Sequence, residues 1–170
     1  MIDYLRKILT GQFEASLCMM NECLETCTQE HWDGKIAKYP FWHLAYHALC
    51  FVDLYLSPSE QSFTFRDLHP QGWKEFDYPS RRFDKKELTE YLVICRRKAV
   101  ETLASETPES LERESGFHWL PFTRGELHVY NLRHVQHHTG QLSAHLRRVD
   151  AALQDPKAIP WVRSGWRIST

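Results

Sequence analysis

Residues 132–142 read LRHVQHHTGQL, and this stretch carries the clearest structural signal in the sequence. His134 and His138 lie four residues apart, so on an α-helix their side chains share one face, with Cβ atoms roughly 5–6 Å apart. Two imidazoles in this arrangement can both direct a nitrogen at one divalent cation, at about 2.0–2.1 Å. A single helix cannot complete such a site, so a third ligand has to come from another segment. The stretch therefore predicts a helix that supplies two ligands to a metal site.

The obvious source of the third ligand is the run FWHLAYHALC at residues 41–50, which places His43 and His47 among apolar side chains. Buried imidazoles need partners for both ring nitrogens, and a shared metal would satisfy several of them at once. The residues alone leave open which histidine joins the site, although a hydrogen-bonded core or rim position is the simpler interpretation of His43. Cys50, one turn beyond His47, is a further candidate for a fourth ligand or a reactive thiol. His137 lies well round the helix from the ligand pair, which indicates a flanking role.

Apolar residues spaced three and four apart predict a first helix from about Asp3 to Thr28, with one buried stripe. A second helix is expected from Pro40, a favourable first-turn residue, to about Leu56, where Ser57-Pro58 stops it. This second helix is apolar nearly all round, so it should be the most buried of the set.

Two further helices begin with capping patterns. Asp84 and Glu87 form a capping-box pair at the start of a third helix. Thr123 and Glu126 repeat the device at the start of a fourth helix, which continues to about Ala152. One broad face of this fourth helix is expected to point into the bundle, and it carries Leu127, Asn131, His134, His138, Gln141, Leu142 and His145.

About 27 residues, Ser57 to Phe83, separate the second helix from the third. Connections of this length usually have a structural or functional reason, and here the segment could return the chain across the bundle so that its two flanking helices run parallel. A chain of 170 residues can bury a real core in one domain, and no domain boundary or internal repeat is visible. We therefore expect an all-α four-helix bundle that forms a single domain over residues 1–170.

Composition excludes several classes of function. The formal net charge is −1 without a long block of one sign, so the electrostatic footprint for nucleic acid is missing. The longest apolar stretch is too short and too polar to span a membrane. No signal peptide is evident and the five cysteines form no paired framework, so we expect reduced thiols in a cytoplasm. The apolar second helix and six tryptophans, with Trp161 and Trp166 beyond the fourth helix, predict a homodimer.

These features resemble those of the DinB/YfiT-like superfamily of metal-binding four-helix bundles. The resemblance rests on the histidine-bearing second helix followed by VDLYL at residues 52–56, on HVQHHTGQL leading into LRR at residues 146–148, and on the long second connection. It implies an up-down-down-up bundle in which His47, His134 and His138 bind one divalent metal, which is nickel or zinc in family members. Many relatives are homodimers, and characterised branches transfer or isomerise with low-molecular-weight thiols such as bacillithiol, mycothiol or glutathione.

Three neutral histidine ligands would leave a fourth position for water or substrate, which is the form that catalytic metal sites take. We therefore expect a metal-dependent enzyme of the thiol-transferase type, which joins a low-molecular-weight thiol to a small-molecule electrophile, with hydrolysis as a second possible reaction. The alternative is a non-catalytic metal- or ligand-binding bundle, whose metal shell would be closed by Cys50 or His43. The sequence assigns no catalytic residue and no thiol-binding residue.

Overall fold

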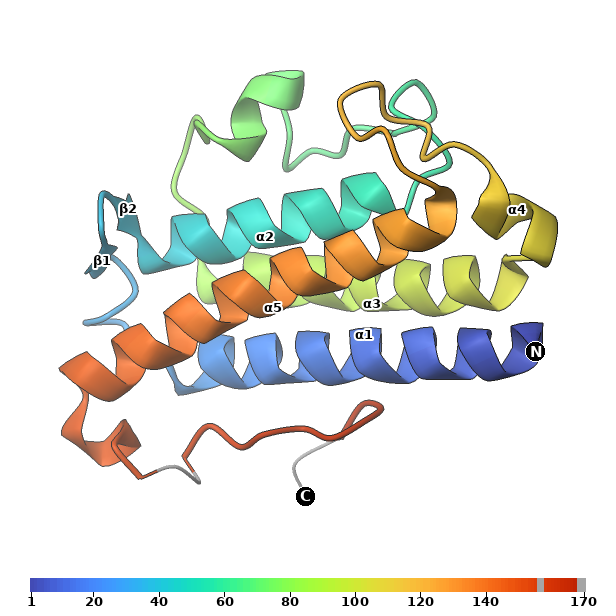
Figure 1. The fold of residues 1–170 in the computed structure, drawn as a ribbon. Coiled ribbons are helices and arrows are strands. Elements are labelled where there is room, and N and C mark those ends of the chain that lie inside the picture. Colours follow the sequence, from blue (N-terminus) through green and yellow to red (C-terminus); the bar gives the residue numbers. More distant parts are fainter. Residues whose placement is uncertain (156–157, 168–170) are drawn as a thin grey trace.

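The computed structural model describes residues 1–155 and 158–167, and this part of the chain is mostly helical, as the all-α prediction requires. Helix α1 packs against α3 and α5, and α2 packs against the same two helices, so a common core lies between them (Figure 1). These four long helices are α1 (Ile2–Thr26), α2 (Phe41–Tyr55), α3 (Lys85–Ser105) and α5 (Arg124–Val149).

Both predicted caps set the start of a helix. At α3 the Asp84 carboxylate accepts from the Glu87 backbone N–H at 2.9 Å, and the Glu87 carboxylate accepts from the Asp84 N–H at 2.9 Å. At α5 the Thr123 hydroxyl accepts from the Glu126 N–H at 3.2 Å, and the described contacts contain no reciprocal bond from the Glu126 side chain. The capping box is therefore confirmed in full at α3 and only in its first half at α5.

The predicted start of α2 is wrong by one residue, because Pro40 is its N-cap and not a first-turn residue. Pro40 belongs to a short antiparallel hairpin, in which it pairs with Lys35. The hairpin consists of strands β1 (Lys35–Ile36) and β2 (Tyr39–Pro40), and Ala37 in its turn has a φ of 56°. A pattern of two residues per strand is too short to recognise by alternation of apolar and polar residues.

Two other differences concern the ends of helices. The fourth long helix ends at Val149 and not at about Ala152, because Asp150 leaves the helical conformation and its carboxylate accepts from the Ala152 N–H at 2.9 Å. This bond begins the 3-10 helix η2 (Ala151–Leu153). An additional short helix, α4 (Pro108–Glu112), follows α3, and its proline stands in the first turn, where a missing N–H costs nothing.

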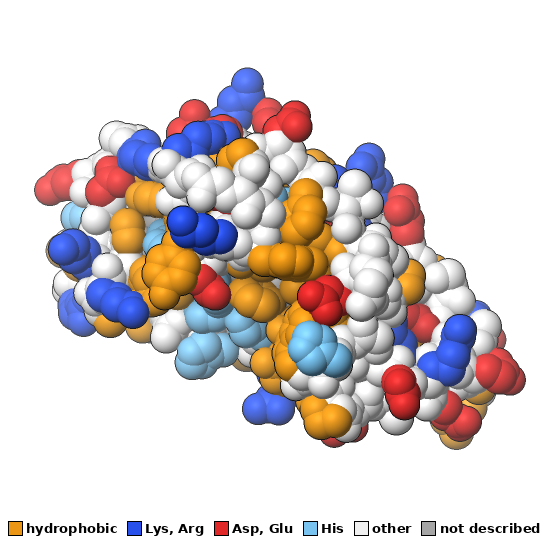
Figure 2. All heavy atoms as spheres, turned by 90° about the horizontal axis from the view of Figure 1, so that it is seen from above, with side chains coloured by type: hydrophobic (Ala, Val, Ile, Leu, Met, Phe, Trp, Pro, Cys, Tyr) orange, Lys and Arg blue, Asp and Glu red, His pale blue; other side chains and the backbone are white. Residues whose placement is uncertain are grey.

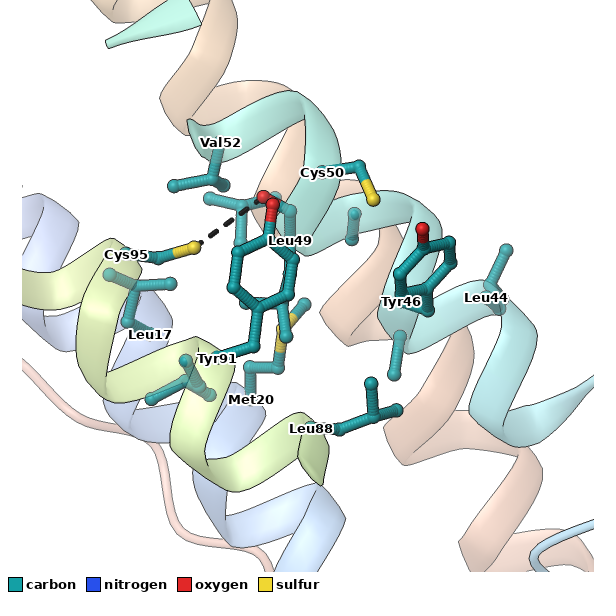
Figure 3. Close-up of a cluster of buried hydrophobic side chains, with 14 of the residues drawn as sticks. Leu17, Met20, Leu44, Tyr46, Leu49, Cys50, Val52, Leu88, Tyr91 and Cys95 are labelled. Atoms are coloured by element: carbon teal, nitrogen blue, oxygen red, sulfur yellow. Dashed lines mark hydrogen bonds between the residues drawn. The ribbon is translucent and has the colours of Figure 1, made fainter. Parts of the chain in front are cut away.

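Helix α2 is buried along nearly all of its length, as predicted: thirteen of its fifteen residues are buried, and only His47 and Phe51 are partly exposed. Figure 3 shows its apolar side chains facing those of α1 and α3, with Leu49 close to Tyr91 and Cys95. The Cys95 thiol donates to the Leu49 carbonyl at 3.5 Å. Each large apolar side chain buried here contributes about 1.5–3 kcal/mol, so the position of α2 is strongly determined.

Buried Arg124, the first residue of α5, connects this helix to the end of α3 through an ion pair and to the end of α2 through hydrogen bonds. The Arg124 guanidinium donates to the Glu106 carboxylate at 3.0 Å, and it also donates to the carbonyls of residues 55–57 at 2.6–3.0 Å. These carbonyls lack partners within their own helix, so Arg124 serves as a C-terminal cap for α2. Burial of Glu106 acts to raise its pKa, but hydrogen bonds from His128, Ser110 and Arg124 outweigh this effect and lower the pKa to about 2. The cluster thereby fixes how α5 is placed along α2.

The long connection between α2 and α3 lies over α2 and contains only one regular element, the 3-10 helix η1 (Gly72–Phe76), drawn in green in Figure 1. Its aromatic side chains pack together: the rings of Phe63 and Trp73 are stacked at 5.4 Å, and the ring of Phe76 lies 5.4 Å from that of Phe51 on α2. Arg66 pairs with the buried carboxylate of Asp53 at 2.7 Å. The connection is therefore attached to α2 along its length.

Residues 158–167 return along α1, where the Gly165 N–H donates to the Gly11 carbonyl at 2.8 Å. Trp166 is partly buried, and the Arg96 guanidinium lies over its ring, 4.6 Å from the ring centre. Trp161, in contrast, is 70 % exposed. One of the two tail tryptophans thus packs on its own chain. Among the described residues, no helix combines the length and the apolar character that crossing a membrane demands.

Candidate metal centre

The three histidines predicted as ligands come together between α2 and α5. His47 stands on α2, and His134 and His138 stand one turn apart on α5. One nitrogen from each ring lies within 4.8 Å of the other two, and the Nε2 atoms of His134 and His138 are 3.1 Å apart. Histidine side chains are grouped beside hydrophobic ones on the face shown in Figure 2. Among the described residues this is the group whose nitrogen, sulfur or carboxylate atoms converge closely enough to hold a metal ion.

The rotation of α5 differs from the sequence-based expectation. Its most buried row contains Asn131, Val135 and Thr139, whereas His134 and His138 are only partly buried. Of the broad face that was expected to point into the bundle, the side that carries Asn131 is therefore buried in the core, whereas the side that carries His134 and His138 is not. The two histidines lie on its flank, toward α2 and the long connection. This position leaves them accessible to a small ligand in a way that a central core position would not.

Hydrogen bonds fix the tautomers of two of the three rings. His138 Nδ1 lies 2.8 Å from the Gln141 side-chain oxygen, and His47 Nδ1 lies 3.1 Å from the Phe76 carbonyl and 3.2 Å from the Asp77 carboxylate. These oxygens can only accept, so in both rings the proton sits on Nδ1 and Nε2 keeps its lone pair. A metal-binding histidine is typically held in this way by a partner on its other nitrogen.

The geometry of His134 tests whether a metal would fit. Its Nδ1 is buried without a partner among the described residues, and its Nε2 faces the Nε2 of His138. With the His138 proton on Nδ1, its Nε2 accepts a hydrogen bond from His134 only if His134 carries its own proton on Nε2, and this leaves His134 Nδ1 as a buried acceptor without a partner among the described residues. A divalent ion could take the place of the proton between these two nitrogens, which lie 3.1 Å apart, so the residues present fit such an ion.

His134 and His138 are neutral at physiological pH. Burial, together with the neighbouring imidazoles of His138 and His47, lowers the pKa of His134 to about 3. Burial likewise lowers the pKa of His138 to about 4, although its hydrogen bond to Gln141 opposes the shift. Metal ions bind the neutral imidazole, so these side chains are already in the ligand form at pH 7.

The other sequence candidates lie outside the cluster of three. The Cys50 thiol is fully buried and lies 3.5 Å from Nε2 of His69, and burial raises its pKa well above the usual value. His43 packs its ring on Trp42, with centroids 5.5 Å apart. The exposed ring of His137 lies 5.1 Å from that of His138, which agrees with a flanking position.

Sequence reasoning missed the contribution of the long connection. Phe76 and Asp77 contact His47, but they belong to an irregular segment in which no periodic pattern indicates where a side chain will lie. The same segment helps to enclose a cavity of about 80 Å³ beside the histidines. It is lined by Tyr39, His43, Leu44, His47, Asp77 and His138.

Comparison with known proteins identified one family. A family model described as the DinB superfamily matches residues 12–142, a span that contains all three histidines. The comparison with curated proteins found no match, and neither did the comparison with solved structures.

Proposed function

Because this chain belongs to the DinB superfamily, we propose that it binds one divalent transition metal through His47, His134 and His138. The observation that carries the proposal is the convergence of three ring nitrogens from two helices, two of them with tautomers set by hydrogen bonds. Nickel and zinc both accept imidazole ligands, and we propose one of these two as the resident ion.

We further propose that the protein is an enzyme that transfers a low-molecular-weight thiol to a small-molecule electrophile. Three histidines leave a coordination position open, and the cavity of about 80 Å³ next to His47 and His138 offers space there. A divalent ion in this site would favour the thiolate form of a bound thiol. In the overall reaction a sulfur–carbon bond forms, the leaving group departs with its electron pair, and the thiol proton passes to solvent.

The chain's own side chains support an external nucleophile. Cys50 is the cysteine nearest in sequence to a proposed ligand, but it is fully buried against His69 and its raised pKa keeps it protonated. A protonated, inaccessible thiol cannot attack a substrate. The ring of Phe51 lies 5.2 Å from that of His134 and 4.8 Å from that of His47, so it shields one side of the site from water.

The non-catalytic alternative requires a closed, four-ligand shell. Cys50 and His43 were the candidates for the fourth ligand, and both lie outside the cluster of three nitrogens. This arrangement favours the enzyme over a purely structural metal site. No particular contact favours hydrolysis over thiol transfer.

The proposal also includes the up-down-down-up order of the four long helices. Helix α2 has 15 residues and spans about 22 Å at 1.5 Å per residue, so the long connection can readily return the chain to the other end of α2. We propose a cytoplasmic location, which is supported by five free, buried cysteines.

We also propose a homodimer, for which the exposed apolar residues Tyr4 and Ile8 of α1 are candidate contacts.

The test combines metal analysis with an assay of thiol transfer. Protein purified without a histidine tag should contain about one equivalent of nickel or zinc. It should accelerate the reaction of bacillithiol, mycothiol or glutathione with a chlorodinitrobenzene. The acceleration should vanish in His138→Ala and in chelated wild type, and it should persist in the matched control His137→Ala. Metal-loaded protein that is inactive with all three thiols would exclude this activity and favour the non-catalytic alternative.

A further inference from the structure

We infer that Asp77 is a positioning residue of the metal centre: its carboxylate lies in ion-pair contact with Nδ1 of His47, stabilises a proton there and thereby directs Nε2 of that ring toward the ion. This inference rests on the proposed metal binding and extends it to the long connection between α2 and α3. The decisive observation is the distance of 3.2 Å between Asp77 Oδ1 and His47 Nδ1.

The two oxygen atoms close to Nδ1 of His47 differ in kind. The Phe76 carbonyl, 3.1 Å from Nδ1, is a neutral backbone group that accepts its hydrogen bond, whereas the Asp77 carboxylate at 3.2 Å is a negatively charged ion-pair partner. A carboxylate behind a histidine ligand orients the ring and makes its free nitrogen a stronger donor to the metal. Asp77 is therefore the neighbour of Nδ1 whose removal changes the charge at the site.

Hydrogen bonds and packing of the neighbouring residues hold Asp77 in position. Its backbone N–H donates to the Lys74 carbonyl and ends η1. The preceding Phe76 is buried against Phe51, and the buried Glu75 carboxylate accepts from the Ser80 N–H at 2.9 Å. These contacts hold both ends of the short segment that passes over His47.

Electrostatics give the carboxylate a second effect. The three proposed ligands are histidines, which bind a metal ion as neutral imidazoles. A divalent ion bound by neutral imidazoles keeps its whole positive charge. Among the described residues, Asp77 is the carboxylate in contact with one of the three rings, so it offsets part of that charge.

Metal titration of Asp77 variants tests the inference. The side chain of Asp77 is 57 % exposed, so Asp77→Asn and Asp77→Ala should fold with an unchanged melting temperature in the metal-free state. Their dissociation constants for nickel and zinc, measured against a competing chelator, should rise by about 10-fold or more. Asp77→Glu should recover part of the affinity. Asp67→Asn, which alters an exposed carboxylate of the same connection, should bind metal as wild type does.

A second measurement reads the tautomer without any metal. In metal-free protein, imidazole nitrogen chemical shifts should show the His47 proton on Nδ1, and Asp77→Ala should increase the fraction with the proton on Nε2. Equal dissociation constants in wild type and in both Asp77 variants would overturn the role of Asp77 while leaving the proposed function intact. Failure of wild type to bind either metal would instead overturn the proposed function and the inference with it.

Discussion

Acid should destabilise the metal-free protein through His134 and His138. An unfolded histidine titrates near pH 6.5, whereas burial in the fold lowers the pKa of these two side chains to about 3 and about 4. Below pH 6.5 the unfolded chain therefore binds protons that the folded protein does not, and stability falls with pH until the folded pKa values are reached. Between pH 7 and pH 5 each of the two histidines therefore lowers the free energy of unfolding by about 2 kcal/mol, which is ~4 kcal/mol for the pair.

Urea unfolding at pH 7 and pH 5 in the presence of a chelator measures this loss. Other buried histidines also titrate, among them His69, whose burial lowers its pKa to about 4, so the comparison between variants is the relevant quantity. The double variant His134→Gln/His138→Gln should lose about 4 kcal/mol less than wild type between the two pH values. His137→Gln, at the exposed neighbour, should behave as wild type. Equal losses in the double variant and wild type would refute the reasoning.

Three further predictions address the metal, a helix cap and assembly. At a free metal concentration 100 times the dissociation constant, wild type should gain about 2.7 kcal/mol of stability, and His138→Ala should gain none in a thermal-shift titration. A variant that keeps stoichiometric metal and this gain would show that His138 is not a ligand. Asp84→Ala removes the complete capping box of α3 and should lower the free energy of unfolding by about 0.5–2 kcal/mol in urea, whereas an unchanged value would mean that the cap does not stabilise α3. Light scattering should give twice the chain mass of 20.2 kDa, and a monomer mass at high micromolar concentration would contradict the homodimer.

The sequence by itself determined the features that depend on local spacing. The distance of four residues between His134 and His138 places them one turn apart on any α-helix, whatever surrounds it. The capping pair Asp84 and Glu87 likewise acts within four residues, so the start of α3 was predictable to the residue. The apolar character of α2 similarly predicted its burial, because a helix without a polar face has to be covered on all sides.

Only the tertiary structure decided which side chains converge in the cluster of three histidines. His43 and His47 lie four residues apart on the same helix, so the spacing of residues in the sequence does not distinguish between them. The placement of α2 along α5 brings His47 to His134 and His138 and leaves His43 stacked on Trp42. The rotation of α5, which sets His134 and His138 at the edge of the core, depends in the same way on how helices pack. Asp77 reaches His47 from an irregular connection 30 residues further along the chain, and contacts of this kind follow from three-dimensional packing because no backbone periodicity encodes them.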